Sequence, residues 1–164
     1  MRRFMFVLSA AFALAVFATP ADAQLKFGAQ LAMATGVSEA SALDGTFGLG
    51  GRAMVDPPLL PIGGFVSGTY YFPEGDVSYW TGTAAAQLRI PLPMVKPYVL
   101  AGWQLRGGEG DTQNGPVVGL GVQLDFMLSL FLEANFEFNE DIAALPDFDN
   151  DPIVIKGGIL FGGG

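Results

Sequence analysis

Carboxylates are the side chains of this sequence that could most readily take part in catalysis, because the chain of 164 residues contains no histidine and no cysteine. Nucleophiles activated by histidine, and zinc sites built on histidine or cysteine, are therefore impossible. Glu133 and Glu137 share one face of a candidate strand, and glycoside hydrolysis uses such a pair of carboxylates. A buried carboxylate needs a cation, however, and Lys156 is expected on the same face of the next strand. We interpret both glutamates as ion-pair partners, so the sequence predicts no enzyme and no cofactor.

Two other motifs resemble binding sites for a metal ion and for phosphate, and both lack an essential part. The segment Asp147–Asp151 begins like a calcium-binding EF-hand loop, but Pro152 and Gly158 stand where that loop requires glycine and glutamate. The glycine-rich segments 48–51 and 119–121 lie within candidate strands, without the helix that follows a phosphate-binding loop. A pI near 4.2 and the absence of a basic patch argue against nucleic acid. We therefore predict no metal site and no nucleic-acid partner.

The N-terminal segment has the layout of a secretory signal peptide. Two arginines follow the first methionine, Phe4–Phe17 form an apolar run, and residues 19–23 have the small-residue pattern of a cleavage site. The apolar run is shorter than the roughly 20 residues that a membrane-spanning helix needs, so an anchor helix is the weaker interpretation. We expect residues 1–23 to be a cleaved Sec-type signal peptide and residues 24–164 to form one domain.

The rest of the chain alternates between apolar residues and small or polar ones, and this period of two is typical of β-strands. Although 51% of the residues are hydrophobic and only 15% are charged, no long apolar run follows residue 23. Each alternating segment is close to the roughly 9–11 residues with which a tilted strand crosses a bilayer. We predict eight strands, at about 24–35, 45–56, 62–73, 79–90, 97–107, 116–126, 130–139 and 152–161.

The two faces of these candidate strands differ in charge. One face is apolar in all eight strands, as Leu25, Phe27 and Leu31 illustrate in the first. A register shift of one residue would put a charge on this face, so the agreement of eight strands is strong evidence. The charged residues within the strands all fall on the other face, and we predict that they form an ion-pair network: Lys26, Arg52, Arg89, Arg106, Asp125, Glu133, Glu137 and Lys156.

The composition of the polar face indicates which side of the sheet is inside. Small residues such as Gly28, Ala32 and Gly48 dominate it, whereas a water-facing exterior carries many long charged side chains. Small residues with a few charges suit the cramped interior of a narrow barrel. We therefore predict an all-β fold, an eight-stranded antiparallel up-and-down transmembrane β-barrel with an ion-paired lumen. A soluble barrel of the lipocalin kind, with its apolar face inward, is the alternative.

The connections between the strands differ at the two ends of the predicted barrel. Those at about 57–61, 91–96 and 127–129 are short, whereas the opposite ones are longer on average and acidic, an asymmetry typical of outer-membrane barrels. The longer connections are at about 36–44, 74–78, 108–115 and 140–151. Aromatic residues gather near the strand ends, where we expect an interfacial girdle of Tyr70, Tyr71, Phe72, Tyr79 and Trp80 at one end and of Phe27, Tyr98, Phe126 and Phe161 at the other.

Three segments carry a resemblance to a known family. Lys96–Trp103, Leu130–Ala134 and a last strand that ends at Phe161 resemble the small eight-stranded outer-membrane proteins of the opacity-protein and OmpA/OmpX type. The resemblance implies an eight-stranded barrel in the outer membrane of a Gram-negative cell, with ion-pair networks inside it. Members commonly end on an aromatic residue that the insertion machinery uses, whereas Gly162–Gly164 follow Phe161 here.

We expect the barrel to be a structural or surface-interaction protein of the cell envelope, exported by its signal peptide and present as a monomer. Its partners would be outer-membrane lipid and lipopolysaccharide, and the outer-membrane assembly machinery. Two alternatives stay open at this point: a narrow or gated pore for small solutes, and a soluble periplasmic binder of an apolar ligand. The interior of eight strands is just wide enough for side chains to fill, which favours the first hypothesis.

Overall fold

The computed structural model describes residues 24–35, 45–57, 60–72, 78–90, 92–108, 112–138 and 153–162. Within this part of the chain there is no helix with the length and apolarity to cross a membrane. The predicted signal peptide 1–23 and most of the acidic connections lie outside the described residues. The strands are β1 (Gln24–Thr35), β2 (Thr46–Asp56), β3 (Ile62–Phe72), β4 (Tyr79–Arg89), β5 (Val95–Gly107), β6 (Gln113–Asp125), β7 (Ser129–Glu137) and β8 (Ile153–Phe161).

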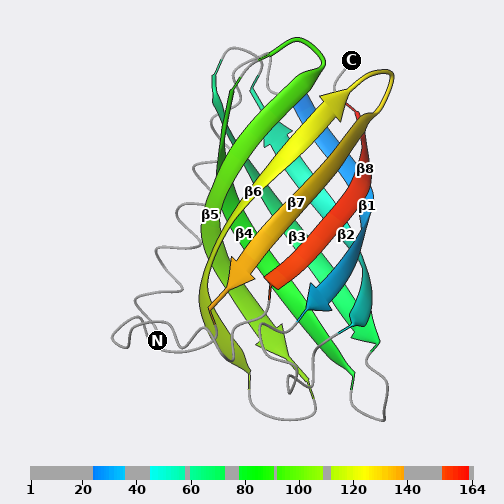
Figure 1. Cartoon of the computed structure of the whole chain (residues 1–164), viewed down its shortest axis with the longest axis vertical. Helices are drawn as coiled ribbons and strands as arrows, with labels where there is room; N and C mark the ends of the chain where they lie inside the picture. Colours follow the sequence, from blue (N-terminus) through cyan, green and yellow to red (C-terminus); the bar gives the residue numbers. More distant parts are fainter. Residues whose placement is uncertain are drawn as a thin grey trace.

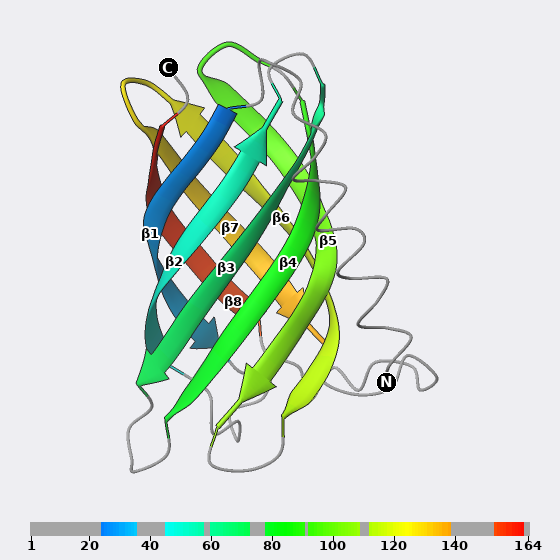
Figure 2. The ribbon, with the colours of Figure 1, turned by 180° about the vertical axis from the view of Figure 1, so that it is seen from behind.

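The eight strands form one closed barrel in sequence order (Figures 1 and 2). Each strand pairs antiparallel with the next, and β8 pairs with β1, where Phe161 lies opposite Phe27. Closure leaves no strand edge without a partner. The prediction of an all-β, antiparallel, up-and-down barrel of eight strands is confirmed.

The two ends of the barrel are named here by their connections. The turn end, at the top of Figure 1, is where β1 begins, β8 ends, and the connections 57–61, 90–94 and 126–128 join β2 to β3, β4 to β5 and β6 to β7. The opposite end is the loop end. Two connections are shorter than the sequence indicates, because β5 begins at Val95 and β6 at Gln113.

Side chains in each strand alternate between the outside and the interior of the barrel. Leu31 and Phe47 on the outside expose 66% and 64% of their surface, whereas Glu133 and Lys156 inside expose 2% and 1%. Apolar side chains therefore cover the outside and polar ones the inside. The soluble alternative requires the reverse, with an apolar interior that takes up a ligand, so it was wrong about which face is inside.

The interior holds larger side chains than the sequence suggests. Small residues do line it, but whole aromatic rings are buried among them. The girdle prediction was wrong for Tyr71, Tyr79 and Tyr98, because the alternation that buries their neighbours turns these three rings inward as well. The buried apolar side chains form one cluster of Met54, Phe65, Tyr98, Leu100, Val117, Phe131 and Leu160 and a second of Ala32, Ala34, Tyr71, Tyr79 and Val154.

Inward-facing glycines make room for these rings. At Gly158 an added Cβ would lie 2.3 Å from the Ala29 carbonyl oxygen and 2.7 Å from Cε1 of the Phe131 ring, which are distances that no Cβ can occupy. Its neighbour Gly157 faces outward, and there an added Cβ would have no atom closer than 3.6 Å. The packing of the barrel therefore requires glycine at position 158 and permits alanine at position 157.

Substitution of these adjacent glycines tests the packing. Gly158→Ala should lower the free energy of unfolding by about 1–3 kcal/mol, because the new methyl group must displace Phe131 or the β1 backbone. Gly157→Ala is the matched control and should change it by less than about 1 kcal/mol. Urea unfolding of the detergent-folded barrel measures both values, and equal losses would contradict the packing described here.

Candidate functional site

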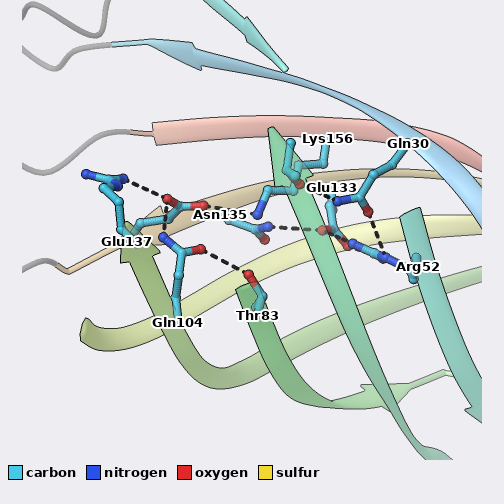
Figure 3. A network of polar contacts seen from close by, with 10 residues as sticks. Gln30, Arg52, Thr83, Gln104, Glu133, Asn135, Glu137 and Lys156 are labelled. Carbon is cyan, nitrogen blue, oxygen red and sulfur yellow. Dashed lines mark hydrogen bonds and ion pairs between the residues drawn. The ribbon is translucent and has the colours of Figure 1, made fainter. Parts of the chain in front are cut away.

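The ion-paired interior is the candidate site, because it holds every charged side chain of the described residues. Six cations and four carboxylates lie there, and three of the four carboxylates each bind two cations, because Lys26 is shared by two of them. The side chains form three groups along the barrel, which we call the central, loop-end and turn-end clusters. Figure 3 shows the central and loop-end clusters, which extend along the lumen as a chain of polar contacts.

The central cluster is built on a two-point ion pair between Arg52 of β2 and Glu133 of β7. Arg52 Nη1 and Nη2 donate to Glu133 Oε2 and Oε1 at 2.9 and 2.5 Å, and both side chains are buried. Glu133 also accepts hydrogen bonds from the Tyr98 hydroxyl at 2.9 Å and from Asn135 Nδ2 at 3.0 Å. Arg52 Nε donates to Gln30 Oε1 at 3.1 Å. The desolvation of both charges is thus offset by a nearly complete set of partners.

Aromatic rings hold the Arg52 guanidinium in place. Its Cζ lies 4.0 Å from the centre of the Phe65 ring and 4.1 Å from the centre of the Phe131 ring. The Phe131 ring lies over Gly158, its cross-strand partner on β8. Cation–π contacts of this kind contribute about 0.5–2 kcal/mol each. Local packing on β8 therefore positions a charge that is carried by β2.

The position of the Tyr98 ring likewise depends on a glycine of a neighbouring strand. Its ring lies over Gly121, which is its register partner on β6, and an added Cβ there would be 2.5 Å from the Tyr98 Cζ atom. This placement brings the phenol hydroxyl to Glu133. Tyr98 is therefore a structural donor to the buried carboxylate and not part of an interfacial girdle.

The loop-end cluster is centred on Glu137 of β7. Lys156 Nζ and Arg106 Nη2 both lie 3.0 Å from its carboxylate oxygens, and Gln104 Nε2 donates to it at 2.5 Å. Thr83 extends the chain by donating to Gln104 Oε1 at 3.0 Å. The register pairs Lys156 with Glu133, yet its amine reaches Glu137 instead. Sequence spacing cannot show this choice, because it depends on where the long side chain extends.

The turn-end cluster contains two residues that sequence analysis missed, Asp56 and Lys96. Asp56 binds both Arg89 and Lys26, the latter at 3.0 Å. Asp125 binds Lys26 at 3.3 Å and Lys96 at 2.6 Å, and also accepts hydrogen bonds from Gln123 and Ser129. Both missed residues lie at strand ends: Asp56 is the last residue of the predicted strand 45–56, and Lys96 was assigned to the connection 91–96. The alternation of β2, which puts Arg52 and Met54 inward, would have predicted Asp56.

All eight charged residues predicted for the network lie in the interior and make ion pairs. The structure brings Arg52 to Glu133, Lys156 and Arg106 to Glu137, and Lys26 to Asp125. Arg89 pairs with Asp56 instead of with a predicted carboxylate. The uncharged members Gln30, Tyr98, Gln104 and Asn135 were not predicted, because an amide or phenol on the inward face has no distinctive sequence pattern.

The arrangement offers little scope for catalysis within the described residues. Each of the four carboxylates is occupied by cations, so neither Glu133 nor Glu137 is free to act as an acid or a base. In this part of the chain no three acidic side chains gather as ligands for a metal ion. The site therefore pairs each buried carboxylate with one or two cations within the lumen.

Comparison with solved structures identifies the architecture. The chain superposes on the N-terminal β-barrel domain of Pseudomonas aeruginosa OprF with a TM-score of 0.63 and 12% sequence identity, over 85% of this chain and 96% of that chain. It has the fold of eight-stranded outer-membrane barrels. Neisserial surface protein A is similar with a TM-score of 0.54 and 18% identity, over 86% of this chain and 94% of that one.

A third similar structure is that of Ail, the attachment invasion locus protein of Yersinia pestis, in complex with the heparin analogue sucrose octasulfate. Its TM-score is 0.54 at 14% identity, over 85% of this chain and 97% of that chain. No protein-family model and no curated protein sequence matches the chain. The common feature is thus the barrel itself, at sequence identities that show the fold alone.

Removal of one partner from the central ion pair tests its energetic importance. Glu133→Ala should lower the free energy of unfolding by about 3–5 kcal/mol, because it leaves the Arg52 charge buried without a carboxylate. The double variant Arg52→Met with Glu133→Leu removes both charges and should recover much of this loss. Urea unfolding of the parent protein, the single variant and the double variant measures the three free energies of unfolding. A double variant as unstable as Glu133→Ala would contradict this explanation, because it has no unpaired charge and keeps most of the side-chain volume.

Proposed function

We propose that this protein is an integral β-barrel of the outer membrane that acts as a structural or surface-interaction component of the cell envelope. The single observation that carries the proposal is the partition of charge. Every charged side chain of the described barrel lies inside, while large apolar side chains are exposed on its outside. In water that exterior would be a very large apolar patch, whereas in lipid it is the expected surface.

The size of the barrel supports a membrane location. Its strands have 9–13 residues, which suits tilted strands that cross a bilayer. Closure satisfies the backbone hydrogen bonds of neighbouring strands within the protein, as a hydrocarbon environment requires. The signal peptide at residues 1–23 would export the chain, and the assembly machinery would insert it. Lipid and lipopolysaccharide are then its immediate partners, and a closed barrel needs no second copy.

The filled interior favours a structural role over a pore. Arg52 and Glu133 meet across the lumen, and Phe65 and Phe131 pack against the guanidinium. A permeant ion would have to displace these buried, hydrogen-bonded groups, at a cost of several kcal/mol. We therefore propose that the barrel presents its loops at the cell surface and does not conduct solutes through its interior.

Gel mobility of the outer-membrane fraction tests the location. The folded protein should migrate differently in cold detergent and after boiling, because a closed barrel of paired strands resists detergent until it is heated. The expected result is a heat-dependent shift in the outer-membrane fraction. Recovery of the protein in the periplasmic extract, with no shift on heating, would overturn the proposal.

Conductance in planar bilayers separates the scaffold from the pore. We expect no discrete channel openings from the purified barrel, since the central cluster closes the lumen. Glu133→Ala serves as the internal comparison, because it removes the closing contact while keeping the barrel. Openings in the parent protein that change in size in this variant would show that the lumen conducts.

A further inference from the structure

The three turns at the turn end are unusually apolar for connections between strands. Residues 57–61, 90–94 and 126–128 read PPLLP, IPLPM and FML, without a charged residue or a polar side chain. Their described side chains are exposed, for example Leu60 at 58%, Leu92 at 48% and Met127 at 105% of full exposure. Turns that face water are normally polar, so these turns require an explanation beyond chain reversal.

One of these side chains is kept at a conformational cost. Met94 has a φ of 65°, in the left-handed region that favours glycine or asparagine. It is the one residue other than glycine with a positive φ in the described part of the chain. The position nevertheless carries a large apolar side chain that is 56% exposed. Packing within the barrel does not explain this choice, because more than half of the residue's surface is exposed.

The backbone of the turns is also suited to a medium without water. Half of the ten residues in segments 57–61 and 90–94 are prolines, which have no backbone N–H group to donate: Pro57, Pro58, Pro61, Pro91 and Pro93. The Leu60, Leu92 and Phe126 amides donate to carbonyl oxygens within their own turns, at 3.4, 2.9 and 3.0 Å. The prolines and these bonded amides reduce the number of free donors in the turns, and exposed donors are what makes turns costly in hydrocarbon.

The charges close to this end are directed away from the turns. Asp56 and Asp125 end the strands that enter two of the turns, yet both side chains bind cations inside the barrel. The exposed apolar side chains of the outside, such as Ile62 and Ile90, continue into the turns without an interruption by charge. The apolar exterior therefore extends over the rim at the turn end.

A lipid surface fits these turns better than a docked protein does. The three turns are all the strand connections at this end, and the start of β1 and the end of β8 take the remaining position, so apolar turns lie around most of the rim. The shortest strands, β7 and β8, have 9 residues. At about 3.3 Å per residue and a tilt of about 40°, such strands cross about 23 Å, slightly less than the apolar band of about 25 Å in outer-membrane barrels. Apolar turns make up the difference.

We propose that the turn end is embedded in the lipid of the adjacent leaflet, where Leu60, Leu92, Met94 and Met127 lie at the boundary of the acyl chains and fix the depth of the barrel. This inference rests on the proposed membrane location and adds to it. It predicts a barrel with one end in lipid and only the loop end in water.

Spin labels on single cysteines test the embedding, and the absence of native cysteine makes every such variant specific. Leu60→Cys, Leu92→Cys and Met127→Cys report on the three turns. Leu120→Cys, on the outer face of β6, reports on the barrel wall, and Thr112→Cys, before β6 at the loop end, is the aqueous control. The labelled full-length chains are reconstituted in phosphatidylethanolamine–phosphatidylglycerol vesicles, and heat-dependent gel mobility establishes that each has folded.

The readout is the collision rate of each label with oxygen, which partitions into lipid, relative to a water-soluble nickel complex. We expect this ratio at the three turns to exceed that at Thr112→Cys several-fold and to approach that at Leu120→Cys. Turn labels as accessible to nickel as Thr112→Cys, with Leu120→Cys in lipid, would overturn the embedding and leave the membrane barrel intact, with its turns in water and open to a protein partner. Nickel access at Leu120→Cys would overturn both proposals.

Discussion

Burial of charge in a narrow closed barrel is the constraint on which the rest of the structure depends. The exterior has no place for a charged side chain, so every lysine, arginine, aspartate and glutamate of the described strands points inward. Inside, a charge without a partner costs several kcal/mol, and each must therefore be paired and hydrogen-bonded. The inward amides, hydroxyls and aromatic rings then follow as the groups that complete these pairs. Glycines supply the space in which the rings lie.

The central pair illustrates how far this dependence extends. Arg52 needs Glu133 as a counter-charge and two aromatic rings as walls, and the position of one ring depends on Gly158. Four strands thus contribute to one buried cation. Because buried ion pairs often stabilise no more than well-packed apolar groups would, their value here is better sought in specificity. A charge that has only one acceptable partner disfavours a strand in the wrong register.

Most of the fold was predictable from the sequence because the period of two is a local property. Alternation determines both the existence of a strand and the face of each residue, so eight strands and all eight predicted inward charges could be derived from spacing alone. Pairing could not be derived, because it depends on side-chain reach. Lys156 passes its register partner Glu133 and binds Glu137. Strand ends were also difficult, and Asp56 and Lys96 were missed there. The three buried tyrosines had inward spacing, but their location near strand ends suggested a girdle. The similarity to the OprF barrel at 12% identity shows that the same fold forms with few residues in common.

Closure between β1 and β8 has a further consequence, for the order of events in folding. Phe27 pairs with Phe161, so the seam joins the first described strand to the last. Contacts between such distant parts of a chain are slow to form, because the intervening segment must be ordered first. Until β8 arrives, β1 has an open edge and Lys156 cannot reach Glu137. A partly synthesised chain therefore has no stable folded state. The complete polypeptide must be kept unfolded until all eight strands can assemble.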